Sequence, residues 1–436
     1  MKTTALQAFL MLAVVLLTLQ FKTHLVPVAG KVWFNNFANK TESFVLGRLA
    51  YSEQNGILSE GALLGSSTGA PEGVAERNYQ YTVYFESIPI KSFWLYKTPP
   101  ALHSLIFTSI DAISPFTNRQ NHQFFLWMCS FFTAAIFTWF LWWVAQTFGF
   151  FPAGISLLSI LLSPWLVVSG GHLYWVFGSL LLPLVTGLHL HHKERQGKTI
   201  GPWLFFIATT LGVLTKCLIN GYEIVTSICV LATIPVFFYA ILDKWSFRRF
   251  ATRFMIVAAG AIFAVLISVG VLVKQIDSAP SSNMDGVTYL KERFFIRSKG
   301  EFLDQNQAIP ERIKESQVKS YSQILKRYLN EGAFYYQFGK DGGRHKINFQ
   351  FFLILLVVLT LAQLLYFKDN LMKTLVASSY IGLLGPLSWI VIFKSHSYLH
   401  VHLNSLFWYL PFMLFLYVGY AYAGKLVWLR AQSFKP

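Results

Sequence analysis

Long runs of apolar residues constrain this chain more than any other feature. A helix needs about 20 predominantly apolar residues to cross the hydrocarbon core of a bilayer. Ten segments are expected to do so: 4–21, 122–147, 150–168, 172–190, 202–219, 223–242, 254–273, 348–367, 374–393 and 403–423. Only 13% of the 436 residues are charged, and 54% are hydrophobic, so lipid must surround most of the chain. The sequence therefore predicts an all-α integral membrane protein.

The first apolar run, Thr4 to Phe21, follows a single basic residue, Lys2. The triplet Val28-Ala29-Gly30 is loosely compatible with a cleavage site for a signal peptide. The run is also close to the length of a full span, which favours a first helix that is retained. In both cases the segment that follows is exported.

The links between the apolar segments differ in charge. Lys and Arg concentrate in links 191–198, 243–253 and 368–373 and in the C-terminal tail, and they are nearly absent near 169–171, 220–222 and 395–402. Because cytoplasmic links carry the excess of Lys and Arg, both termini are expected in the cytoplasm. This pattern accounts for the net charge of +16 without a nucleic-acid partner.

Two long segments, 22–121 and 274–347, then lie outside. They divide the chain into an N-terminal transmembrane region (1–273, with the first outer loop), a second outer loop (274–347) and C-terminal transmembrane helices (348–436). Both outer loops are expected to bear short interfacial helices. In the second loop, apolar residues recur at helical spacing and predict one amphipathic helix on the membrane or on the bundle: Ile313, Val318, Ile324, Leu325, Tyr328 and Leu329.

Ionisable side chains at membrane depth are costly, so each one is a candidate for function. The orientation gathers many of them at the outer ends of the spans: His172 and Tyr174, then Lys216, Asn220 and Glu223, then Lys394, His396, Tyr398, His400 and His402. The first outer loop adds Glu42, Arg48, Glu53, Glu60, Lys97 and Asp111. One face of the membrane thus collects carboxylates, imidazoles and ammonium groups.

Such a set suits a reaction on a lipid-linked phosphate. Basic groups hold the phosphate at the interface, and a carboxylate takes the proton of an acceptor hydroxyl. Glu42 begins a helical pattern soon after the first span, yet a solvated loop carboxylate is an equally simple interpretation. Arg48 can pair with a carboxylate or a phosphate, or lie among lipid headgroups. Lys216 and Glu223 can form a purely structural ion pair.

The string from Lys394 to Asn404 contains three histidines within seven residues. His396 and His400 are four apart and would share one helix face, as zinc ligands often do. His402 would point elsewhere on a regular helix, and no carboxylate lies in the string. A bound divalent metal, contacts to phosphate and interfacial hydrogen bonds all remain open.

Several of these motifs resemble the GT-C superfamily of polytopic glycosyltransferases. Glu42 in Asn39-Lys40-Thr41-Glu42-Ser43-Phe44 looks like the acidic residue at the start of that superfamily's first outer loop, and Tyr96-Lys97-Thr98-Pro99-Pro100 is similar to the turn that ends it. The string from Lys394, followed by Trp408-Tyr409-Leu410-Pro411, looks like its late basic motif. The chain lacks the familiar Asp-Glu pair, so Glu53 and Glu60 stay alternatives to Glu42.

The resemblance implies transfer of a sugar from a polyprenyl-phosphate donor to an outer-face glycan or glycolipid. Glu42 would be the general base, and Lys394 with the histidines would contact the donor phosphate. No cofactor is certain, and the need for a divalent metal differs between branches. The expected location is a bacterial inner (plasma) membrane, with the active face periplasmic or extracellular.

Two other functions stand beside this one. A polymerase or ligase of lipid-linked polysaccharide would use arginines of a late outer loop, and the second outer loop offers Arg293, Arg297, Arg312, Arg327 and Arg344. A transporter or flippase of lipid-linked glycans would need a polar path across the bilayer, whereas the cytoplasmic halves of the spans are almost entirely apolar.

Overall fold

The structure of the chain is a computed structural model, which describes residues 3–28, 31–303, 309–337, 344–401 and 405–433. Within these ranges, eight helices are long and apolar enough to cross a membrane. They are α1 (Thr3–Thr23), α5 (Asn118–Phe148), α9 (Pro202–Asn220), α10 (Val225–Leu242), α11 (Phe247–Asp277), α15 (Phe349–Ala362) continued by η2 (Gln363–Phe367), α16 (Asn370–Ile392), and η3 (Ser405–Trp408), η4 (Tyr409–Met413) and α19 (Leu414–Ser433) taken together. The protein is therefore an all-α integral membrane protein.

Two of the ten expected segments differ from a simple span. Segment 150–168 forms α6 (Phe150–Leu161) and α7 (Pro164–Gly170), which meet at 74°. Pro164 lacks an N–H and disfavours helical geometry at the residue before it, so the helix breaks there. Segment 172–190 is helical only from Gly178, as α8 (Gly178–Arg195), and its histidines and basic residues make it more polar than the eight apolar helices. Residues 171–177 form a link, so His172 and Tyr174 precede α8 and do not open it.

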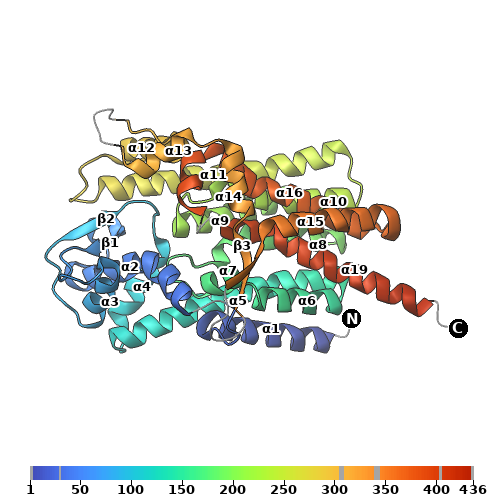
Figure 1. Ribbon diagram of the computed structural model, residues 1–436, viewed down its shortest axis with the longest axis horizontal. Coiled ribbons are helices and arrows are strands. Elements are labelled where there is room, and N and C mark those ends of the chain that lie inside the picture. The colour runs from blue at the N-terminus through green and yellow to red at the C-terminus, as the bar shows by residue number, and fades with distance from the viewer. Residues whose placement is uncertain (1–2, 29–30, 304–308, 338–343, 402–404, 434–436) are drawn as a thin grey trace.

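The long helices pack side by side along the longest dimension of the molecule (Figure 1). The closest pairs are α9 with α11, α10 with α16 and α1 with α5. A Cβ on Gly260 of α11 would lie 2.8 Å from the carbonyl oxygen of Phe206, so glycine permits α9 and α11 to approach closely. Large aromatic side chains such as Trp143, Phe238 and Phe415 fill the centre of the bundle.

The long segment between α1 and α5 folds into a small unit at one end of the bundle. Its elements are α2 (Lys31–Asn55), η1 (Ser59–Ala62), β1 (Leu64–Ser67), α3 (Glu76–Phe85), β2 (Phe93–Tyr96) and α4 (Leu102–Ile113). The two strands pair antiparallel, with Leu64 opposite Tyr96. Gln80 of α3 exchanges two hydrogen bonds with the backbone of Ser67, which fixes α3 on the hairpin. This unit lies at the left of Figure 1, and both termini lie at the right.

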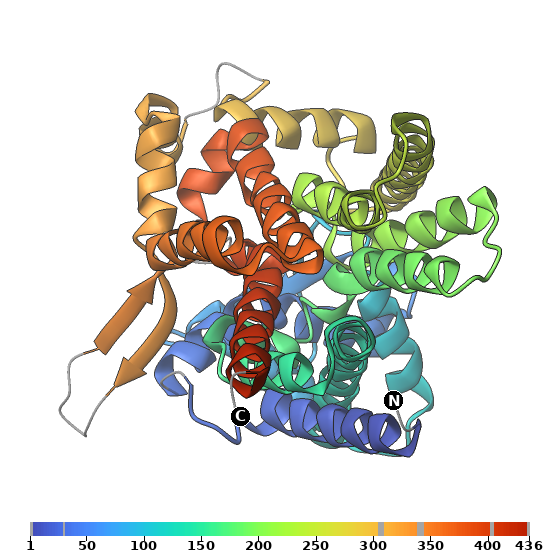
Figure 2. The same cartoon turned by 90° about the vertical axis from the view of Figure 1, so that its right-hand side faces the viewer.

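The long segment between α11 and α15 contains α12 (Gly286–Lys299), α13 (Glu311–Val318), α14 (Tyr321–Leu329) and the antiparallel strands β3 (Gly332–Gln337) and β4 (Arg344–Asn348). The single amphipathic helix predicted here is wrong: the chain breaks between α13 and α14, where Ser320 caps α14. Ile324 and Tyr328 are buried as expected, whereas Val318 is 79% exposed. The hairpin β3–β4 projects sideways from the bundle (Figure 2), and the short helix α17 (Lys394–Leu399) packs against α12 and α13.

Candidate functional site

Glu42 lies in the middle of α2, on the face that packs into the protein, and is only 4% exposed. Its Oε1 atom is 2.8 Å from Nε2 of His122, near the N-terminal end of α5. The same oxygen accepts a hydrogen bond of 3.2 Å from the hydroxyl of Tyr81 on α3. Three separate elements therefore converge on one carboxylate.

The charge state of Glu42 follows from these contacts. Burial alone would raise the pKa of the carboxyl group, because desolvation disfavours the charged form. The hydrogen bond and the charge of His122, together with His172 and Tyr81, outweigh burial and bring the pKa below its ordinary value. Among the described residues, no Lys or Arg forms an ion pair with this carboxylate. Glu42 is therefore an ionised acceptor whose described partners are imidazole and phenol groups, with no lysine or arginine among them.

His172 lies beside this group, on the link between α7 and α8. Its Nε2 atom is 3.2 Å from Oγ1 of Thr41, and its Nδ1 atom accepts a hydrogen bond from the backbone N–H of Tyr174. His103 of α4 is also buried nearby, and burial with the proximity of His172 lowers its pKa to about 3. In the described part of the chain, neither ring nitrogen of His103 has a hydrogen-bond partner. Imidazole groups thus continue the polar region from Glu42 towards Tyr174.

Tyr174 connects this region to a second group of polar side chains. Its hydroxyl is 3.4 Å from the hydroxyl of Tyr96, at the end of β2. Burial raises the pKa of both phenols, and the nearby carboxylate of Glu223, on the link between α9 and α10, adds to this effect. The same carboxylate lies 3.8 Å from a guanidinium nitrogen of Arg297 on α12. Burial raises the pKa of Glu223, and Arg297 opposes this effect. Arg297 thus brings a cation to a largely buried position.

Arg297 also faces the late histidine string. The rings of His396, on α17, and His400, directly after its last residue, lie 4.4 Å apart, as expected for residues four apart on one helix face. Burial, and then the charge of Arg297, lower the pKa of His396 well below its ordinary value. Nδ1 of His396 is buried and has no partner among the described residues. This row of polar side chains, called the seam below, therefore runs through Glu42, the imidazoles of His122, His172 and His103, then Tyr174 with Tyr96, Glu223, Arg297 and the pair His396 and His400.

The other half of the string points away from this seam. Lys394 donates a hydrogen bond of 3.1 Å to the carbonyl of Gln317, and Tyr398 donates to the carboxylate of Glu315. Both partners belong to α13. Lys394 and Tyr398 therefore anchor α17 to α13, whereas His396 and His400 belong to the seam. His402, the third predicted histidine, lies outside the described residues.

Three predicted phosphate contacts have other partners in the structure. The buried guanidinium of Arg48 donates to the carbonyls of Ile57 and Ser59, at 2.5 and 2.7 Å, and so holds the turn after α2. The ammonium of Lys216 donates to the carbonyls of Gly221, at 2.8 Å, and Glu223. Lys97 donates to the hydroxyl of Ser282. Lys216 therefore contacts the backbone carbonyl of Glu223 and not its side chain, as the predicted ion pair required. The carboxylate of Glu223 pairs with Arg297 instead.

The two alternative bases are also placed differently from Glu42. Glu60 accepts two hydrogen bonds from Ser281, which tie η1 to the loop after α11. Glu53 faces Asp111, and burial together with this second carboxyl raises its pKa from 4.5 to about 7. Among the residues that the structure describes, neither Glu53 nor Glu60 is hydrogen-bonded to an imidazole, whereas Glu42 is.

The seam contains side chains that the sequence analysis did not select. His122, Tyr81 and His103 were not named, although His122 stands at the outer boundary of a predicted span, where an ionisable residue is itself a signal. Arg297 was named only as one of five arginines. Within the described ranges, no group of three or more His, Cys, Asp or Glu side chains is arranged to hold a metal ion.

Comparisons with protein-family models, with curated proteins and with solved structures found no match to this chain. The geometry of the seam therefore carries the functional argument.

Proposed function

We propose that this protein is a membrane glycosyltransferase that moves a sugar from a polyprenyl-phosphate donor to a glycan or glycolipid acceptor on the outer face. The observation that carries the proposal is the buried carboxylate of Glu42, which contacts His122 and Tyr81 and forms no ion pair with a described lysine or arginine. A structural carboxylate at such a depth would normally be paired with a cation. A general base must instead keep a lone pair for the proton that it receives.

The proposed reaction divides its tasks along the seam. Glu42 accepts the proton of the acceptor hydroxyl while that oxygen forms a bond to the anomeric carbon of the sugar. The bond between this carbon and the phosphate oxygen breaks, and its electron pair leaves with polyprenyl phosphate. Arg297 stabilises the negative charge that develops on the phosphate, with His396 and His400 beside it. The polyprenyl chain would lie along the lipid-exposed helices.

The proposed topology sets the face on which this occurs. Ten spans, with the bent pair α6–α7 counted as one and α8 included, place both termini in the cytoplasm. The Arg- and Lys-rich links then lie on the inner side, as the positive-inside rule requires. The elements α2, α3 and α12, which carry Glu42, Tyr81 and Arg297, lie at the opposite end from the termini (Figure 1), so we propose a periplasmic or extracellular site in a bacterial inner membrane.

The placement of Arg297 also favours a second candidate, a polymerase or ligase of lipid-linked polysaccharide, because such an enzyme would use a late-loop arginine on the same phosphate. The two functions share the leaving group and differ in what is transferred. The products distinguish them: one sugar for the glycosyltransferase, and a block of many sugars for the ligase. A flippase would move the lipid and release no polyprenyl phosphate.

The test uses purified protein with membranes from the organism of origin, lacking this chain but retaining the acceptor. A panel of polyprenyl-phosphate sugars with radiolabelled sugar groups is added, and both labelled product and released polyprenyl phosphate are measured. With one donor of the panel, labelled product and released polyprenyl phosphate should form in equal amounts. Movement of donors between leaflets without release of polyprenyl phosphate would overturn the proposal.

A further inference from the structure

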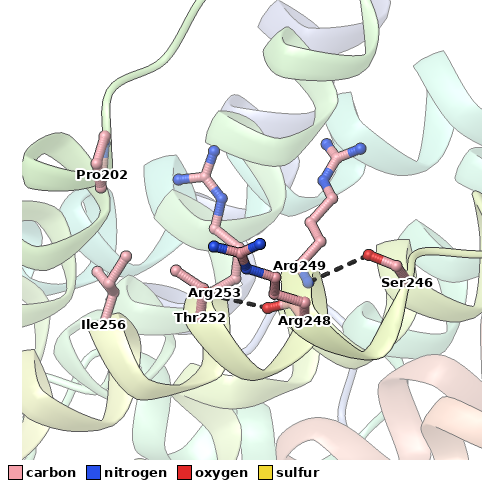
Figure 3. Close-up of a pocket in the computed structure, with 7 residues that line it drawn as sticks. All are labelled: Pro202, Ser246, Arg248, Arg249, Thr252, Arg253 and Ile256. Carbon is pink, nitrogen blue, oxygen red and sulfur yellow. Dashed lines mark hydrogen bonds between the residues drawn. The ribbon is translucent and has the colours of Figure 1, made fainter.

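A pocket of about 400 Å³ lies at the beginning of α11, at the end of the bundle opposite the seam. Its walls come from Pro202, at the start of α9, and from side chains between Ser246 and Ile256. Figure 3 shows Arg248, Arg249 and Arg253 projecting from the same side of α11, with Pro202 and Ile256 at the opposite end from Ser246. The pocket therefore has a cationic part and an apolar part.

The cationic part carries more positive charge than the protein neutralises. Arg249 and Arg253 share one carboxylate, with guanidinium nitrogens 3.5 and 2.6 Å from Oε1 of Glu194. Arg248 is exposed and forms no ion pair with any described carboxylate. Nη1 of Arg253 is buried without a hydrogen-bond partner among the described residues. An anion in the pocket would neutralise the excess charge and satisfy this donor.

Aromatic rings hold two of the guanidinium groups in place. Arg253 lies over the ring of Phe205, at 4.1 Å from its centroid, and Arg249 lies over Trp245, at 4.3 Å. Such stacking fixes a planar guanidinium while leaving its edge free to donate hydrogen bonds. The pocket is thus preorganised for a group with several acceptor oxygens, such as a phosphate.

The surroundings of the pocket favour a phosphate that is attached to a lipid. Trp203 is 74% exposed, Phe247 82% and Met255 63%, and all three lie on the helices that form the pocket. In a membrane protein these side chains face acyl chains and the interface. An anionic phospholipid can place its phosphate among the arginines and its chains against this apolar surface.

We propose that this pocket binds the phosphate of an anionic lipid of the cytoplasmic leaflet, and that the bound lipid stabilises the ends of α8, α9 and α11. The site is independent of the proposed glycosyl transfer. Free phosphate has the same acceptor oxygens as the lipid headgroup, but it has no acyl chains to contact the apolar surface.

The test measures the thermal unfolding of the full chain in a neutral detergent. Phosphatidylglycerol, phosphatidylcholine or inorganic phosphate is titrated separately. Phosphatidylglycerol should raise the Tm in a saturable way, and phosphatidylcholine should not. Arg248→Gln should need about tenfold more phosphatidylglycerol for half of the effect, which corresponds to the loss of one charge-assisted hydrogen bond.

Two variants make the result specific. Lys373→Gln removes an exposed cation at the start of α16, on the same side of the membrane in the proposed topology, and should behave as the wild type. Arg248→Lys keeps the charge and should lose less affinity than Arg248→Gln. Because Arg248 has no ion-pair partner among the described residues, neither substitution at this position should lower the Tm without lipid.

Three results would overturn the proposal. No rise in Tm with phosphatidylglycerol would remove the site. An equal loss of affinity in Lys373→Gln would mean that general surface charge attracts the lipid. An equal rise with inorganic phosphate alone would show an anion site that does not recognise a lipid.

Discussion

Two Glu–His pairs lie at opposite ends of this protein and differ in what surrounds them. At the end far from the termini, Glu42 is 2.8 Å from His122, and its other hydrogen-bond partner among the described residues is the phenol of Tyr81. At the end near the termini, Glu194 is 3.4 Å from Nδ1 of His191 and also pairs with Arg249 and Arg253. The two carboxylates have the same chemistry, but two guanidinium groups pair with Glu194, whereas an imidazole and a phenol contact Glu42.

Because of this difference, Glu42 is available for reaction, whereas Glu194 holds helices together. Two guanidinium groups occupy Glu194 and connect α8 to α11. A base in that position would have to give up both ion pairs before taking a proton. Glu42 has only neutral or weakly basic neighbours within hydrogen-bonding distance among the described residues, so proton uptake breaks no ion pair with Lys or Arg.

The largest expected effect is that of Glu42→Gln. The amide keeps the shape of the side chain but cannot accept the proton, so turnover should fall about a thousandfold with little change in Tm. The measurement is the rate of sugar transfer per folded molecule. Glu60→Gln is the matched control and should keep the wild-type turnover. Near-normal turnover in Glu42→Gln would remove this residue from the mechanism.

The opposite outcome is expected for Glu194→Gln. Arg249 and Arg253 lose their shared counter-charge in a partly buried place, which should lower the free energy of unfolding by roughly 3 kcal/mol. Denaturant unfolding gives the stability, and transfer per folded molecule should stay unchanged. A large loss of turnover without loss of stability would contradict the structural role assigned to Glu194.

His122→Asn tests whether the imidazole positions Glu42. The shorter amide cannot keep the 2.8 Å contact, so the carboxylate loses its strongest stabilising partner and its pKa rises. Turnover should fall roughly tenfold or more, and the acidic limb of the pH–rate profile should move to higher pH. A lower rate with an unmoved profile would indicate only local disruption.

The two faces of α17 offer a smaller contrast. His396→Asn should raise the KM for the donor about tenfold, because this side chain lies beside Arg297 in the seam. Lys394→Gln should change the KM less than threefold, since Lys394 binds the carbonyl of Gln317. Steady-state kinetics with a varied donor concentration would compare them. The reverse order would restore Lys394 as the phosphate contact.

The smallest effect concerns Glu53 and pH. Burial and Asp111 raise the pKa of Glu53 to about 7, so its protonated form is favoured by folding. This contribution to stability is complete below pH 4.5 and is lost as the pH rises through about 7. Glu53→Gln should flatten the decline in Tm over that interval. An identical pH dependence in the variant would exclude this carboxyl pair as its source.

The sequence predicted most of the helices, because a long apolar run has few alternatives to a membrane span. It did not predict the break at Pro164 or the shortening of α8, where buried polar residues and a proline compete with hydropathy. Glu42 was selected because it follows the first span closely. Its partners come from α3 and α5, and no local pattern encodes a contact between residues 80 positions apart, as in Glu42 and His122.

The late string shows the same limit. Spacing alone paired His396 with His400, and the rings do lie side by side. The same spacing pairs Lys394 with Tyr398, and only the packing of α13 against α17 shows that this second pair faces away from the seam. Arg297 could not be chosen from five loop arginines, because its role depends on how α12 packs.

The most direct test of the central claim is the face on which the product emerges. Sealed vesicles of known orientation, carrying donor with a labelled sugar, are treated after the reaction with periodate, which does not cross the membrane and cleaves vicinal diols. We predict that wild-type product is oxidised in right-side-out vesicles and protected in inverted ones, and that Glu42→Gln forms none in either. Product that is oxidised in inverted vesicles and protected in right-side-out ones would place the chemistry at the cytoplasmic end and contradict the account.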